Sequence, residues 1–149
     1  MPGGAIAVAS DHAGFDLKEI LKRDLQEAGH EVLDLGTNSS QSVDYPDFGA
    51  AMGDAVASGK AKRGVLVCGT GIGISIAANR NPEVRAALVH DVTSARLARE
   101  HNDANVVAFG QRLIGTEPAR EALKVFLNTK FEGGRHAARV AKLSKGCTK

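Results

Sequence analysis

The chain has 149 residues, of which 43% are hydrophobic and 24% are charged. This length and balance are typical of one globular domain, and they exclude a disordered chain, a collagen and a coiled coil. The net charge is +2 and only 4% of the residues are aromatic, which disfavours a surface that binds nucleic acid through basic patches and stacked bases. We therefore expect a single domain over residues 1–149 with no nucleic-acid partner.

Two further features concern the compartment. The sequence has no apolar run of the roughly 20 residues that a membrane-spanning helix requires, and its first residues lack a basic secretory leader. Only two cysteines occur, Cys68 and Cys147, which are too few for a disulfide framework. We therefore expect a protein of the reducing cytoplasm with no membrane partner.

Short apolar runs alternate with segments of helical period along the chain. In chain order they predict strand 5–9, helix 15–28, strand 31–35, a polar loop over 37–45, helix 46–57, strand 64–68, a glycine-rich turn over 69–73 and a helix through residue 79. Strand 85–90, helix 93–101, strand 104–109 and helices 117–129 and 135–144 follow. Unbroken apolar strands separated by helices indicate a parallel sheet with both faces covered. We predict a doubly wound, Rossmann-like α/β fold with five parallel strands and an extra C-terminal helix.

In such a sheet, ligands bind beyond the carboxyl ends of the strands, near the point at which the strand order reverses. Polar or reactive residues directly follow three of the predicted strands. They are Asp11 and His12 after the first, Cys68 with the glycine turn at the third, and His90 and Asp91 at the fourth. The sequence therefore places its candidate chemistry at the expected edge of the sheet.

The glycine turn, GTGIG at 69–73, places several backbone amides before a predicted helix. Such amides can bind a phosphate or an oxyanion formed during a reaction; alternatively, the glycines only permit a tight turn. A dinucleotide fingerprint would need a small residue at Ile76. A cysteine phosphatase loop would need an arginine at Ile74. Because neither motif fits, phosphoryl transfer through Cys68 is disfavoured.

Cys68 itself has two interpretations. Hydrogen-bond donors and a helix start close to a thiol favour its ionised form, so the residue suits a base that abstracts a proton. Cysteine is also among the residues most often buried for packing alone. From its position in the sequence, the two roles are equally good explanations.

The remaining candidates also have structural alternatives. His101 ends a predicted helix, where a histidine often serves as a surface or capping group, and Asp11 with His12 could form a structural hydrogen bond. Tyr45, in the polar loop, suits a loop anchor as well as a pocket wall.

Arg135 and Arg139 are one helical turn apart and share a face of the last predicted helix. Two guanidinium groups at this spacing suit a phosphate monoester, and Arg112, after the fifth strand, could join them. A solvated basic helix is the alternative, because several lysines follow.

Five blocks of the sequence together resemble ribose-5-phosphate isomerase type B, a family that also includes galactose-6-phosphate isomerase subunits. The blocks are SDHAGF at 10–15, DYP at 44–46, CGTGIGISIAAN at 68–79, HNDANV at 101–106 and EGGRH at 132–136. They follow one another in the family's order over residues 5–143. Any one block is a weak signal, whereas five in register are highly specific.

The resemblance implies interconversion of an aldose phosphate and a ketose phosphate through a cis-enediolate, with no metal or organic cofactor. It implies that Cys68 is the base, that His101 helps to open the sugar ring, and that Thr70 lies near the reacting oxygens. One branch of the family uses a glutamate in the glycine loop instead of the cysteine. Ile74 stands at that position here, so the chain resembles the cysteine branch.

The resemblance also implies a set of substrate contacts. Those expected to hold the enediolate are the amides of Gly69, Gly71, Ile72 and Gly73, together with Asn102. Those expected to hold the sugar and its phosphate are Asp11, His12, Tyr45, Arg112, Arg135 and Arg139.

The family resemblance further implies a homodimer in which the helix that carries His101 and the C-terminal arginines serve the neighbour's Cys68; it leaves open whether dimers pair further. The expected substrates are ribose 5-phosphate and ribulose 5-phosphate, with allose 6-phosphate or galactose 6-phosphate as alternatives. An alternative of a different class is a non-catalytic sensor of a nucleotide or phosphate on the same fold. Such a sensor would not need Cys68 and His101 together.

Overall fold

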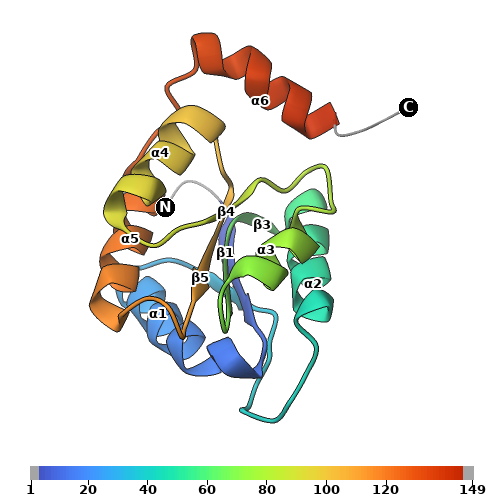
Figure 1. Ribbon diagram of the computed structural model, residues 1–149, viewed down its shortest axis with the longest axis vertical. Helices are drawn as coiled ribbons and strands as arrows, with labels where there is room; N and C mark the ends of the chain where they lie inside the picture. Colours follow the sequence, from blue (N-terminus) through green and yellow to red (C-terminus); the bar gives the residue numbers. More distant parts are fainter. Residues whose placement is uncertain (1–3, 146–149) are drawn as a thin grey trace.

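The computed structural model of the chain, which describes residues 4–145, contains one sheet of five parallel strands in the order β2-β1-β3-β5-β4 (Figure 1). The strands are β1 (Ala5–Ser10), β2 (Val32–Asp34), β3 (Ala61–Cys68), β4 (Ala86–Leu88) and β5 (Val106–Gly110). The helices are the 3-10 turn η1 (His12–Gly14), α1 (Phe15–Glu27), α2 (Tyr45–Ala57), α3 (Ile72–Ala78), α4 (Val92–Asn102), α5 (Thr116–Asn128) and α6 (Arg135–Lys145). The predicted doubly wound α/β fold is confirmed, and Cys147 lies outside the described residues.

Helices cover both faces of the sheet (Figure 1). Helices α1, α4 and α5 bury one face in a core that contains Leu21, Phe109 and Phe126. Helices α2 and α3 bury the other face in a second core around Met52 and Leu66. Helix α6 lies against α4 at the top of Figure 1, away from the sheet.

The direction of Cys68 follows from the pleat of β3. Val65 and Val67 belong to the core on the α1 side, whereas Leu66 and Cys68 belong to the core on the α2–α3 side. Successive side chains of a strand point to opposite faces, so the thiol is directed toward the face that α2 and α3 cover.

The observed boundaries differ from the predicted ones in two places that matter. Strand β3 begins at Ala61 rather than at Gly64, because backbone pairing with β1 continues through the polar residues that the apolar pattern left out. Tyr45, which the sequence placed in the polar loop, is the first residue of α2, and Asp44 is the N-cap. Pro46 favours this start because its fixed φ suits the first turn of a helix.

The strand order reverses between β1 and β3, since β1 pairs with β2 on one side and with β3 on the other. The carboxyl ends of these two strands therefore mark the crevice at which doubly wound proteins bind their ligands. Among the helices of residues 4–145, none is both long enough and apolar enough to span a bilayer.

Candidate active site

Cys68 is the last residue of β3 and is 4% exposed. The backbone N–H of Gly71 donates to its Sγ over 3.1 Å, and the N–H of Ile72 donates to the Thr70 hydroxyl over 3.2 Å. A hydrogen bond to the charged form of a group stabilises that form. The turn therefore directs a backbone amide at the sulfur atom of Cys68.

Gly71 occupies a position that only glycine fits. Its φ is +79°, and a Cβ there would lie 2.5 Å from Leu88 Cδ1 and 2.8 Å from the carbonyl carbon of Phe109. Gly71 is therefore needed for the tight turn. The same residue also provides the N–H that donates to Cys68. Any side chain at residue 71 must displace the amide that faces the sulfur.

Gly71→Ala is expected to reduce the rate of a reaction at Cys68 by roughly 10²–10³-fold, the usual cost of losing one donor that stabilises charge in the transition state. Steady-state kinetics would measure the loss. Gly29→Ala is the matched control, because Gly29 also has a positive φ (+90°) but nothing within 4 Å of its Cβ position. Equal turnover in the two variants would contradict the role of the Gly71 amide.

The end of β1 contributes Asp11 and His12 beside this turn. Asp11 is buried, and its Oδ1 accepts the N–H of Gly14 over 3.1 Å. A Cβ on Gly14 would lie 2.5 Å from the carbonyl oxygen of Val67, so η1 packs directly on the end of β3. The N–H of Val43 donates to Nδ1 of His12 over 3.1 Å, which ties the polar loop to η1.

Arg112 and Tyr45 complete this edge. The N–H of Arg112 donates to the carbonyl of Gly69 over 2.9 Å, and its guanidinium borders the same glycine, 3.2 Å from the Cβ position. The Tyr45 ring lies against Gly73, with Cε1 2.5 Å from the Cβ position. The structure thus brings most of the predicted site residues together at the carboxyl edge; they are Asp11, His12, Tyr45, Cys68, Gly69, Thr70, Gly71, Ile72, Gly73 and Arg112.

The third polar position, after β4, has a structural explanation. Asp91 is the N-cap of α4, and its Oδ1 accepts the N–H of Ser94 over 2.6 Å. Hydrogen bonds from the backbone and side chain of Ser94 lower the pKa of Asp91. This residue therefore caps a helix.

His101 and Asn102 lie at the opposite edge of the sheet. Helix α4 begins after the carboxyl end of β4 and ends before the amino end of β5, which is parallel to β4. Asn102 lines a hollow of about 360 Å³ together with Leu143 of α6. Arg135 and Arg139 belong to α6, at the top of Figure 1, whereas β1, β3 and β5 end at the bottom. A single chain does not bring these four residues to Cys68.

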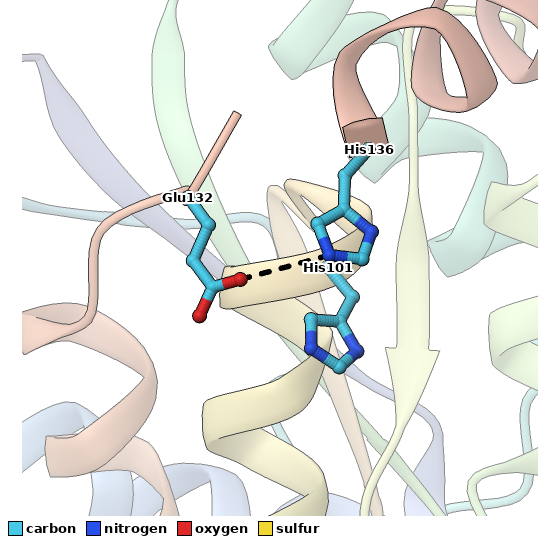
Figure 2. A group of neighbouring side chains, drawn as sticks. All are labelled: His101, Glu132 and His136. Atoms are coloured by element: carbon cyan, nitrogen blue, oxygen red, sulfur yellow. Dashed lines mark ion pairs between the residues drawn. The ribbon is translucent and has the colours of Figure 1, made fainter. Parts of the chain in front are cut away.

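His101 has two close neighbours that the sequence did not assign a role (Figure 2). Its ring stacks on that of His136, with centroids 4.4 Å apart and planes 15° from parallel. Oε1 of Glu132 lies 3.6 Å from Nε2 of His136. Burial, followed by the charges of His101 and Arg135, lowers the pKa of His136, and Glu132 opposes this shift. The only hint of this contact in the sequence was the four-residue spacing of Glu132 and His136.

The parallel sheet, with a cysteine, a glycine turn and polar residues at its strand-order reversal, defines a doubly wound α/β protein with a candidate active site at that edge. The sequence model of the Ribose/Galactose Isomerase family matches residues 6–143. The chain belongs to this family, which confirms the family resemblance seen in the sequence.

Three comparisons illustrate the relationship. Ribose-5-phosphate isomerase B of Escherichia coli is 47% identical over 135 residues, which cover 91% of this chain and 91% of that protein. The D-erythrulose-4-phosphate isomerase of Pectobacterium atrosepticum is 41% identical, over 93% and 92% of the two chains. The structure of Clostridium thermocellum ribose-5-phosphate isomerase B superposes with a TM-score of 0.93 at 48% identity, over 95% of both chains.

Proposed function

We propose that this protein interconverts D-ribose 5-phosphate and D-ribulose 5-phosphate, with Cys68 as the base and no metal or organic cofactor. The observation that carries the proposal is a thiol at the end of β3 that accepts the amide of Gly71. The names of the Escherichia coli and Clostridium thermocellum relatives support the substrate. A reducing cytoplasm is the expected compartment, because this chemistry needs Cys68 as a free thiol.

The proposed reaction moves one proton between neighbouring carbons. The Cys68 thiolate removes the proton from C2 of the open-chain aldose, and the electron pair of that C–H bond forms the C1=C2 bond of a cis-enediolate with negative charge on O1. Return of the proton to C1, with transfer of the hydroxyl proton from O2 to O1, gives the ketose. A positioned base lowers the first barrier, and donors directed at the oxygen stabilise the developing charge.

The other residues have supporting roles in this proposal. The amides of the 69–73 turn and the Thr70 hydroxyl lie beside Cys68 and are assigned to the enediolate oxygens. Tyr45 borders the same turn, Asp11 and His12 follow β1 at the same edge of the sheet, and all three are assigned to the sugar. His101 supplies the proton that opens the furanose ring, and the arginines bind the phosphate, which orients the reacting carbons.

The complete site is proposed to form between two copies of the chain, each of which supplies one edge of its sheet. Cys68 and His101 lie at opposite edges of one chain, so a second copy is needed to bring them together. Ile72 and Ile76 on α3, near the first edge, and Leu143 on α6, near the second, are large apolar side chains that remain exposed. Apolar surface of this kind next to both half-sites suits a homodimer contact.

The proposed activity is tested by following formation of ribulose 5-phosphate from ribose 5-phosphate in EDTA, with and without iodoacetamide. A Cys147→Ser background leaves Cys68 as the only thiol. Turnover that disappears on alkylation would support the assignment.

Absence of turnover with ribose 5-phosphate would contradict the five-carbon substrate, and allose 6-phosphate and galactose 6-phosphate would then be assayed. The Pectobacterium relative is named for a four-carbon sugar phosphate, so the number of carbon atoms in the named substrate differs among relatives. If no sugar phosphate turns over and nucleotides protect the protein against thermal unfolding, the sensor interpretation would take precedence.

Arg135→Ala is expected to raise KM more than it lowers kcat. A phosphate contact that is equally strong in the ground and transition states contributes to binding without lowering the chemical barrier. Lys142→Ala is the matched control, since Lys142 is another exposed cation of α6. A decrease confined to kcat would contradict the assignment of Arg135 to the phosphate.

A further inference from the structure

A cluster of potential metal ligands lies where α4 ends and the segment before α6 passes it. His101, Glu132 and His136 each offer one ligand atom, and these atoms all lie within 4.8 Å of one another (Figure 2). The N–H of Glu132 donates to the carbonyl of Glu100 over 3.1 Å. This bond fixes the segment that carries Glu132 against the last turn of α4, so the backbone holds the three side chains together.

His136 gives a second and independent indication of a ligand. The residue is only 7% exposed, and its Nε2 is buried with no hydrogen-bond partner. The Glu132 carboxylate, at 3.6 Å, lies beyond hydrogen-bond distance of this nitrogen. A buried polar atom without a partner costs free energy, and a metal ion between the imidazole and the carboxylate would remove that cost.

The geometry needs only side-chain rotation to become a metal site. Zn²⁺ binds histidine nitrogen at about 2.0–2.1 Å, so two ligand atoms in tetrahedral geometry are about 3.4 Å apart. The Glu132 carboxylate is exposed and the His101 ring is half-buried, so both can turn toward the fixed ring of His136. Rotation of His101 would open the present stack of the two rings.

We propose that His101, Glu132 and His136 bind one divalent transition-metal ion of the Zn²⁺ type. Two imidazoles and one carboxylate are ligands that suit Zn²⁺, whereas Mg²⁺ and Ca²⁺ prefer oxygen ligands alone. Arg135 and Arg139, whose charges act on His136, oppose a bound cation, and Glu132 offsets them.

The consequence for activity rests on the proposed function. A histidine with one ring nitrogen bound to a metal ion can no longer be protonated to imidazolium, and the metal holds its ring within the cluster rather than at the sugar. Occupancy of this site therefore prevents His101 from acting as the acid, and Zn²⁺ acts as a reversible inhibitor of an enzyme that works without metal.

Binding is tested by isothermal titration of the full chain with Zn²⁺, and with Mg²⁺ as a comparison, in a Cys147→Ser background. We expect one Zn²⁺ per chain and no comparable binding of Mg²⁺. Glu132→Gln and His136→Asn should each weaken Zn²⁺ binding by about tenfold or more, since even groups that only support metal ligands contribute that much. The controls His90→Asn, at an exposed histidine, and Cys68→Ser should leave the affinity unchanged.

Activity is measured separately, as the ratio of rates with and without Zn²⁺, for the unchanged chain and for each variant that keeps Cys68. Inhibition should follow occupancy, reverse with EDTA and require more Zn²⁺ in Glu132→Gln. Binding that survives Glu132→Gln and His136→Asn, or that Cys68→Ser abolishes, would overturn the proposal and place the ion at the thiol. Because binding is measured without substrate, an inactive protein that binds Zn²⁺ would refute the isomerase assignment alone.

Discussion

Replacing Cys68 with alanine is expected to abolish isomerisation of ribose 5-phosphate while leaving its binding largely intact. The thiol is the proposed base, whereas the phosphate contacts are other residues, so removal of Sγ deletes one step of the chemistry. Loss of a general base typically reduces the rate by about 10²–10⁴-fold. The rate of ketose formation and the heat of ribose 5-phosphate binding measure the two effects independently.

Two variants serve as controls for this result. Cys68→Ser keeps the shape of the side chain and a hydrogen-bond acceptor for Gly71 but replaces the thiol by a much weaker acid, so it should be nearly as inactive as Cys68→Ala. Cys147→Ala should remain fully active. An active Cys68→Ala variant would remove Cys68 from the role of base.

Mixing two inactive variants is expected to restore activity if the site is shared between subunits. Cys68→Ala damages one half-site and His101→Ala damages the other. In a hybrid dimer, one site then carries both changes and the second carries neither. After complete subunit exchange between equal amounts of the two proteins, about a quarter of all sites in a twofold-symmetric dimer should be intact.

The control for this experiment mixes Cys68→Ala with Thr70→Ala. Both residues lie at the carboxyl edge of the same chain, so every site of the hybrid remains damaged and no activity should return. Recovery in the control, or its absence in the Cys68→Ala and His101→Ala mixture despite demonstrated exchange, would contradict a shared site.

The order of strands and helices could be predicted from the sequence because burial on both faces leaves a local pattern. A central parallel strand such as β3 is apolar at successive positions, and a covering helix such as α1 is apolar at helical spacing. The ends of the strands and helices were harder to predict from the sequence. Lys62 and Arg63 near the start of β3 are polar, and only the pairing of Ala61 and Arg63 with β1 makes this segment part of the strand.

Contacts between distant segments could not be predicted in the same way. Lys18 is completely buried in the structure, where Nζ binds Asp34 at 2.9 Å and Glu19 at 3.0 Å. Burial acts to raise the pKa of Asp34, but the hydrogen bonds from Lys18, Lys22 and the Gly36 amide lower it overall. Nothing in a helical pattern distinguishes Lys18 from a solvated lysine, because its burial depends on the Asp34 carboxylate of β2.

The sequence by itself determined the fold class, the family and the presence of Cys68 and the glycine turn at the end of a strand, since these are properties of short, contiguous segments. Only the tertiary structure decided which residues meet. It placed Asp11, Tyr45 and Arg112 around the glycine turn, because parallel strands deliver their carboxyl ends to one edge. It placed His101 at the other edge beside His136, because a helix that follows a parallel strand must run back across the sheet before the next strand begins.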